Sequence, residues 1–244
     1  MQLTISGENI ESLLYRENKP ILELKISYPQ IMGPLSKQAE FHFNDYYRKQ
    51  SRQINLYART KLHRRASEEC RSADEKEYDF TMHSHIRTFS VPRLDPRYTS
   101  IILDQYHYEG RLHGMTQRTG NTWDLSRGVV VPLSYFFRKN AAYRGRIMDY
   151  ICNQIKQQKE GGEIPFFENP LRIAKTFFQE ANYYLSNDGI ILYYPLYTLA
   201  PYCAGILSYK IPFGTLDGCW ASKRKPTEIP AYTGSFATER ERLL

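Results

Sequence analysis

The chain has 244 residues, of which 41% are apolar and 24% are charged, and this composition excludes collagen, a coiled-coil rod and a fully disordered chain. Its formal net charge of +7 favours acidic partners but says nothing about the fold. The sequence has no apolar run near the roughly 18–20 residues of a membrane helix, and residues 1–9 have no apolar core of a secretory signal peptide. We therefore expect a soluble, cytoplasmic chain without a membrane segment.

The first predicted elements are a short strand and one long helix. Residues 21–26 largely alternate apolar and polar side chains, which indicates a strand, and Pro29 should end it because proline removes a ladder donor. Residues 34–77 contain neither Gly nor Pro after Pro34, and apolar residues recur at helical spacing. The predicted core stripe consists of Phe43, Tyr47, Ile54, Tyr57 and Leu62, and Ser36 is the expected N-cap.

From Tyr78 the pattern changes to a period of two, which predicts strands. Residues 78–89 form the first of these strands, residues 98–108 its return strand, and residues 115–125 a third. Three consecutive strands of this kind predict an antiparallel meander.

The C-terminal half predicts two shorter helices followed by strands. One helix covers residues 141–159, with Asn140 as its cap, and a second follows Asn169 with Ile173, Phe177 and Ala181 as its stripe. The dipeptide Asp188-Gly189 between apolar runs predicts a β-hairpin. A last strand fits residues 206–212, and the polar chain from residue 217 onward should fray.

Along the chain, the predicted helices are grouped between groups of strands, which is typical of an α+β fold. We expect antiparallel sheet or sheets packed with one long and two shorter helices. The expected organisation is an N-terminal region 1–130, a C-terminal region 131–217 and a polar tail 218–244.

No standard catalytic motif of a hydrolase, kinase or dinucleotide enzyme is present. Four histidines leave a metal-dependent enzyme open as an alternative: His83 and His85 share one strand face, and His107 and His113 lie on or after the neighbouring strand. The competing interpretation is a solvated strand face. Neither the histidines nor the four cysteines have zinc-site spacing. Cys203 and Cys219 could form a disulfide in an oxidising compartment, but we expect them to be reduced.

Residues 48–65 hold seven Lys or Arg and no acid, so binding of nucleic acid or another anionic polymer is a further alternative. We disfavour it, because a basic helix face is commonly just solvated. Two loops are better candidates for ligand binding, since loops on a rigid sheet often carry recognition. One is the glycine-bracketed loop 110–114, and the other is the apolar loop 195–205. Their candidate residues are Arg111, His113, Tyr197 and Tyr202.

Several segments resemble one bacterial family. They are the Asn182–Leu185 and Ile190–Tyr194 runs around the Asp188-Gly189 turn, Leu199–Tyr202, Ala204-Gly205, Tyr209–Phe213, Tyr106–Gly114, Asn121–Leu125 and Leu133–Phe137. The chain thereby resembles, over roughly residues 20–217, the extracytoplasmic domain of RsiV, the anti-sigma factor of sigma V. The same domain precedes the catalytic module of a peptidoglycan deacetylase.

This resemblance implies a two-part α+β fold that binds rather than catalyses, in relatives that are mostly extracytoplasmic. RsiV itself senses lysozyme. The chain departs from that pattern, because it lacks a membrane helix, a sigma-binding segment and a deacetylase module, and because Arg111 and Leu112 replace small loop residues. Lysozyme is strongly basic and would be repelled by a net charge of +7, so we do not transfer lysozyme binding. We expect a non-catalytic binding or sensor domain without a cofactor, whose ligand is a protein or a cell-wall glycan.

Overall fold

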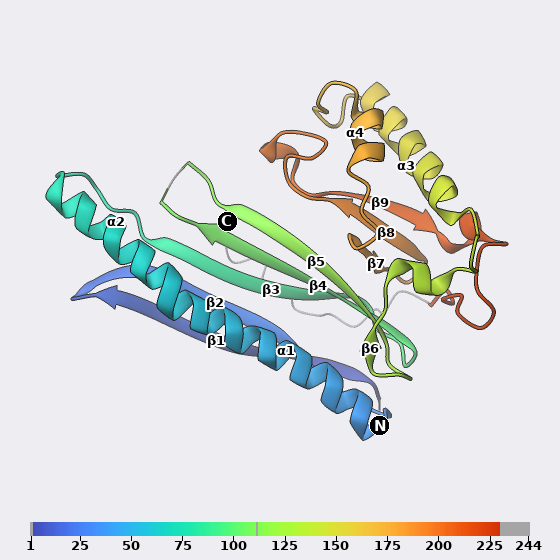
Figure 1. The fold of residues 1–244 in the computed structure, drawn as a ribbon, viewed down its shortest axis with the longest axis horizontal. Helices are drawn as coiled ribbons and strands as arrows, with labels where there is room; N and C mark the ends of the chain where they lie inside the picture. The colour runs from blue at the N-terminus through green and yellow to red at the C-terminus, as the bar shows by residue number, and fades with distance from the viewer. Residues whose placement is uncertain (1, 111, 230–244) are drawn as a thin grey trace.

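The computed structural model describes residues 2–110 and 112–229. Within them, nine strands form two sheets, accompanied by one long helical stretch and two shorter helices, so the α+β prediction is confirmed (Figure 1). A six-stranded sheet has the order β1-β2-β3-β4-β5-β6, and a three-stranded sheet has the order β7-β8-β9. The bounds of the first sheet are β1 Thr4–Arg16, β2 Lys19–Met32, β3 His83–Arg93, β4 Tyr98–Tyr108, β5 Met115–Asp124 and β6 Val129–Val130.

The first sheet begins with a long hairpin that the sequence did not reveal. β1 is polar along most of its length, so its alternation is weak, and it pairs antiparallel with β2. β2 continues past Pro29, where we expected it to end. β3 pairs with β2 only over Leu22–Ile26, so at Pro29 one side of the strand has no strand partner and a proline is tolerated there.

The long helix connects β2 to β3, which lie parallel, and it covers one face of the sheet (Figure 1). It consists of α1 (Lys37–Tyr57), a π-helical turn (Ala58–Leu62) and α2 (His63–Glu75). Ser36 is the N-cap, as predicted, because its side chain accepts from the Ala39 amide at 3.1 Å.

The π-helical turn corrects the predicted core stripe. Buried side chains recur every four residues from Ala58 to Cys70, and on a straight α-helix that spacing drifts by about 40° at each step. The wider turn absorbs this drift at its start. Tyr57, which we expected in the core, is 49% exposed, and the residue after it, Ala58, is buried instead.

Strands β3, β4 and β5 form the antiparallel meander that the period-two pattern predicts. Successive side chains of β4 point to opposite faces. Ile101 and Leu103 pack with Phe43 of α1, whereas Ile102 packs with tyrosines of the second sheet. The first sheet is therefore covered by the long helix on one face and by the second sheet on the other.

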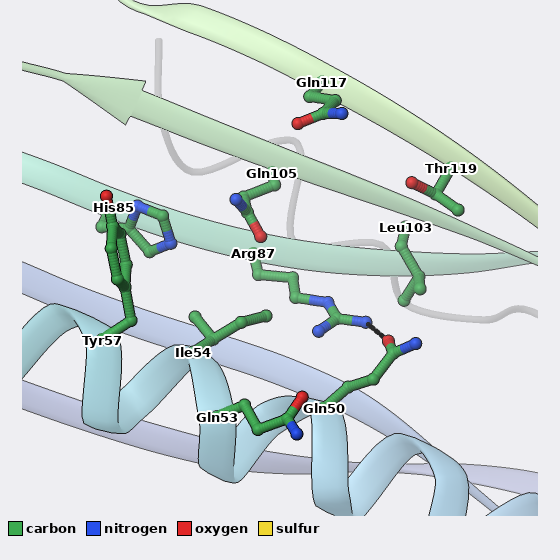
Figure 2. A pocket seen from close by; sticks show the side chains of 10 residues that line it. All are labelled: Gln50, Gln53, Ile54, Tyr57, His85, Arg87, Leu103, Gln105, Gln117 and Thr119. Carbon is green, nitrogen blue, oxygen red and sulfur yellow. Dashed lines mark hydrogen bonds between the residues drawn. The ribbon is translucent and has the colours of Figure 1, made fainter.

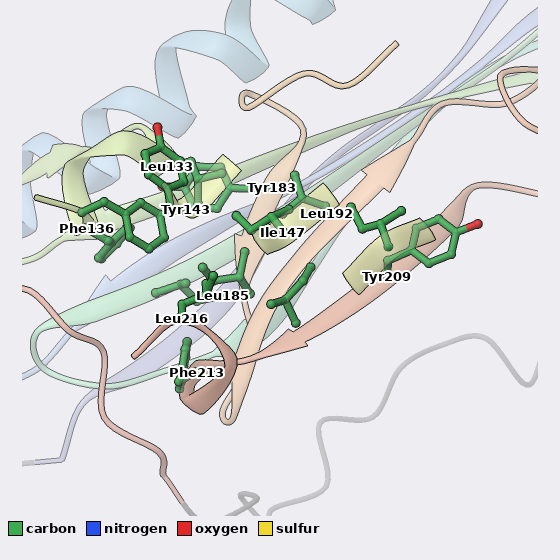
Figure 3. Packing of buried hydrophobic residues seen from close by; sticks show 14 of the residues in the cluster. Leu133, Phe136, Tyr143, Ile147, Tyr183, Leu185, Leu192, Tyr209, Phe213 and Leu216 are labelled. Atoms are coloured by element: carbon green, nitrogen blue, oxygen red, sulfur yellow. The ribbon is translucent and has the colours of Figure 1, made fainter. Parts of the chain in front are cut away.

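The second sheet comprises β7 (Tyr183–Leu185), β8 (Gly189–Tyr194) and β9 (Leu207–Pro212), as the hairpin signal predicts. Helices α3 (Tyr143–Glu160) and α4 (Pro170–Thr176) accompany it. Figure 3 shows Ile147 of α3 among Tyr183, Leu185 and Leu192 of the second sheet, in the largest apolar cluster.

Three local predictions in this half are wrong. Asn140 does not cap α3, which begins at Tyr143; it adopts a left-handed turn with φ of 66° instead. Phe177 is 54% exposed because α4 ends at Thr176 before the expected stripe is complete. The chain from 217 to 229 does not fray, since Trp220 stacks on Phe137 with ring centroids 5.0 Å apart. Residues 230–244 of the polar tail lie outside the described residues.

Candidate functional site

The two loops chosen from the sequence meet in space. His113 of the loop after β4 stacks on Tyr202, with ring centroids 4.0 Å apart and planes inclined by 16°. The hydroxyl of Tyr197 lies 2.9 Å from His113 Nε2. We call His113, Tyr197 and Tyr202 the aromatic platform. Arg111, the fourth predicted ligand residue, lies outside the described residues.

Backbone requirements hold the first of these loops in place. Gly110 has a φ of +72°, a conformation that glycine adopts without strain, and a Cβ at Gly114 would overlap the ring of Tyr106. Leu112 at the loop tip is fully exposed, and Met115 is 45% exposed. His113 and Tyr197 are exposed as well, so the platform lies at the surface next to Leu112, which is the exposure that a binding surface needs.

The four histidines do not form one cluster. His83 and His85 are buried on the face of β3 that looks toward the long helix, and the β3–β4 register places His107 opposite His85. Their Nδ1 atoms lie 3.3 Å apart. His113 belongs to the platform instead. The alternative interpretation of a solvated strand face is therefore wrong for His83 and His85.

Acidic and basic side chains of α2 and of the loop after β4 lie next to this histidine row. His107 Nε2 lies 2.9 Å from Glu109 Oε1, which also pairs with Arg65, and His83 Nε2 lies 3.2 Å from Glu69 Oε2. Burial lowers the pKa of His83, and burial together with the neighbouring His107 lowers the pKa of His85 to about 4. Both imidazoles are therefore neutral at pH 7. Among residues 2–110 and 112–229, no group of three or more His, Cys, Asp or Glu is arranged to hold a metal ion.

Many side chains of the basic stretch 48–65 have partners. Lys49 pairs with Asp45 and Arg64 with Glu68, each one helical turn along, while Arg59 donates to Asn55 and to Ser12 of β1. Since Arg65 is also paired with Glu109, much of the positive charge is compensated locally.

A cavity of about 400 Å³, which we did not predict, lies between α1 and strands β3–β5 (Figure 2). Its lining is mostly polar and consists of Gln50, Gln53, Ile54, Tyr57, His85, Arg87, Leu103, Gln105, Gln117 and Thr119. Figure 2 shows Arg87 reaching from β3 toward α1, where it donates to Gln50 Oε1 at 2.6 Å. We call this space the Arg87 cavity.

The sequence held a signal for the Arg87 cavity. Between Tyr47 and Ile54 the inward-facing helix position is occupied by Gln50 and Ser51 rather than by an apolar residue. On the strands, Arg87 and Gln105 follow the buried residues His85 and Leu103 by two positions, and Gln117 pairs opposite Gln105. A polar break at the same level in several elements indicates a polar space between them, but the strand register that aligns these breaks is known only from the structure.

The fold and these sites define a two-sheet α+β protein with a polar cavity under its long helix and an exposed aromatic platform. Residues 134–214 match a family described as "Protein of unknown function (DUF3298)", and residues 15–116 match a family described as "Deacetylase PdaC". No curated protein matches the chain.

Two solved structures share the fold. A DUF3298 family member from Bacteroides fragilis is 18% identical, with a TM-score of 0.69, and the match covers 90% of this chain and 94% of that chain. A DUF3298 family protein from Pseudomonas aeruginosa is 16% identical, with a TM-score of 0.59 and coverage of 93% and 98%. At such identities the likeness establishes the fold alone. No helix in the described part of the chain is long and apolar enough to span a membrane.

Proposed function

We propose that this chain is a non-catalytic binding domain and that the aromatic platform contacts its ligand. The observation that carries this proposal is the stacking of His113 on Tyr202, with Tyr197 bonded to the same imidazole. The two loops are more than 80 residues apart in sequence, yet their rings form one exposed surface. Domain region 131–217 supplies two of the rings and region 1–130 the third, so we propose that both regions act together.

A cell-wall glycan is the ligand that the platform favours first. Tyrosine offers an apolar ring face together with a polar tip, and a sugar offers an apolar face of C–H groups edged with hydroxyls. Tyr197 is 44% exposed and held with a φ of 61°, so its ring is presented by a constrained backbone. The resemblance to the RsiV-type domain and the PdaC match support a cell-wall ligand and an extracytoplasmic location.

A protein partner is the second candidate, and Leu112 favours it. A fully exposed leucine gains from contact with an apolar surface. We do not propose lysozyme as this partner, because the net charge of +7 opposes its approach.

The test is a binding assay with purified peptidoglycan fragments, alongside a pull-down from host lysate and culture medium. Replacing Tyr197 or Tyr202 by Ala removes a stacking face, and we expect affinity to fall at least about fivefold, equivalent to about 1 kcal/mol. Tyr78→Ala is the matched control, because Tyr78 is 48% exposed and takes no part in the ring contacts of the platform. Unchanged binding by both platform variants would contradict the proposal. The compartment in which a partner is captured would indicate where the protein works.

A further inference from the structure

We propose that the Arg87 cavity is a second binding site, which takes a small monocarboxylate that also carries hydroxyl or amide groups. Arg87 would bind the carboxylate, and the amide side chains around it would bind the rest of the molecule. This site is separate from the aromatic platform, since none of the platform residues lines the cavity.

The first argument is that Arg87 is buried without an anion. Arg87 is only 3% exposed, and its guanidinium carries five N–H donors. Among the described residues it donates to Gln50 Oε1 and forms no ion pair with any carboxylate. A buried charge without a counter-charge is costly, so such a group is expected where a ligand supplies the missing anion.

The buried Arg93 and the half-buried Arg118 show that this state is exceptional. Arg93 is 1% exposed, pairs with Asp95 and donates to backbone carbonyls, including that of Thr227 at 2.8 Å. Arg118 makes two parallel hydrogen bonds to Asp104, at 2.8 and 2.7 Å. The fold thus gives Arg93 and Arg118 each an acidic partner of its own, while the cavity lining around Arg87 contains no Asp or Glu.

The charge of the cavity selects a monoanion. Arg87 supplies one positive charge, and His85 is neutral at pH 7 because burial and His107 depress its pKa. A dianion such as phosphate would leave one negative charge uncompensated, and a neutral ligand would leave Arg87 unpaired. The planar guanidinium fork also matches the two oxygens of a carboxylate.

The rest of the lining describes the remainder of the ligand. Gln53, Gln105 and Gln117 provide amides that both donate and accept, and Thr119 adds a hydroxyl. His85 Nε2 is buried and has no hydrogen-bond partner among the described residues, so it offers one more position for a ligand group. A volume of about 400 Å³ lies within the range of pockets that hold small molecules. A sugar acid or an N-acylated amino acid meets these requirements.

The experiment compares carboxylates with neutral partners of the same skeleton. Wild-type protein, Arg87→Gln and Arg52→Gln are titrated by calorimetry and by thermal shift. The last variant loses the same charge at an exposed position outside the cavity. The probes are acetate, glucuronate against glucose, N-acetylmuramate against N-acetylglucosamine, and N-acetylalanine against its amide. Chloride and inorganic phosphate are added at matched ionic strength.

We expect at least one carboxylate to bind wild type and Arg52→Gln with equal affinity, and Arg87→Gln at least about tenfold more weakly. The neutral compound of the same skeleton should not bind. The pair that shows this difference identifies the ligand as a sugar acid or as an N-acylated amino acid. If no carboxylate exceeds chloride, or if Arg87→Gln binds as well as wild type, the proposal is overturned. Stronger Arg87-dependent binding of phosphate would overturn the carboxylate assignment. Should Arg87→Gln fail to fold, Gln117→Leu replaces it, because Gln117 lies on the exposed side of the cavity and its loss should weaken binding severalfold.

Discussion

The buried histidine His85 should make the protein lose stability between pH 7.5 and pH 5, well before its carboxylates are protonated. In the folded chain the pKa of His85 is about 4, because burial and the neighbouring His107 disfavour the charged imidazole, whereas its ordinary value is 6.5. Between these two pKa values the unfolded chain binds more protons than the folded chain does. Stability therefore falls as pH drops through this window and levels off below about pH 4.

The size of the effect follows from the two pKa values. At pH 5 an unfolded histidine is almost fully protonated while His85 remains mostly neutral, and the linkage relation gives a loss of about 2 kcal/mol relative to pH 7.5. His83 adds to the loss in the same direction, since burial also lowers its pKa. The ion-paired carboxylates of Asp74 and Asp188 affect stability over a different pH range. Arg16 and Lys210 hold their pKa values below 3.8, so their contribution is lost only below about pH 4.

The assay is urea unfolding followed by the fluorescence of the two tryptophans, of which Trp123 is buried, at pH 7.5 and pH 5. The variant His85→Gln keeps a polar side chain of similar size but cannot be protonated. Its loss of stability between the two pH values should be smaller than that of wild type by about 2 kcal/mol. The control His42→Gln removes an exposed histidine of α1. If His85→Gln loses as much stability at pH 5 as wild type does, the reasoning about a neutral buried imidazole is refuted.

Two further predictions concern the junction of the sheets. An added Cβ in Gly120→Ala would overlap the carbonyl oxygen of Tyr183, so we expect urea unfolding to show a loss of about 3 kcal/mol. Gly145→Ala is its control, because nothing lies within 4 Å of that position in α3 and the helix should gain up to about 1 kcal/mol. Asp104→Asn should cost about 2 kcal/mol in the same assay, because it leaves the half-buried guanidinium of Arg118 without its anion. Equal stability of Asp104→Asn and wild type would show that solvent replaces the pair.

The elements that could be predicted from the sequence are those with a strong period. The meander, the Asp188-Gly189 hairpin and the buried face of α3 follow from local spacing alone. β1 escaped prediction because its exposed, polar strand has little alternation, and its stability comes from pairing with β2. The π-helical turn escaped because its cause, a run of buried residues at spacing four, is visible only when the buried face is known.

The sequence predicted more of the aromatic platform than of the Arg87 cavity. Glycine chemistry and tyrosine content indicated the two loops that meet at the platform, although the contact of His113 with Tyr202 depends on the packing of the two sheets. The Arg87 cavity depends on register. Arg87, Gln105 and Gln117 lie side by side only because β3, β4 and β5 pair as they do, and a shift by one residue would place them on the other face.

This dependence on register also separates binding from folding within the same strands. Odd-numbered side chains of β4 and β5, such as Leu103, Gln105 and Gln117, face the long helix and line the Arg87 cavity. Even-numbered ones face the second sheet: Ser100 accepts a hydrogen bond from the Leu185 amide. Substitutions at odd and even positions of one strand should therefore divide into effects on ligand affinity and effects on the joining of the two sheets. If alanine substitutions along β5 changed both ligand affinity and the joining of the two sheets at every position, this division between the two faces would be wrong.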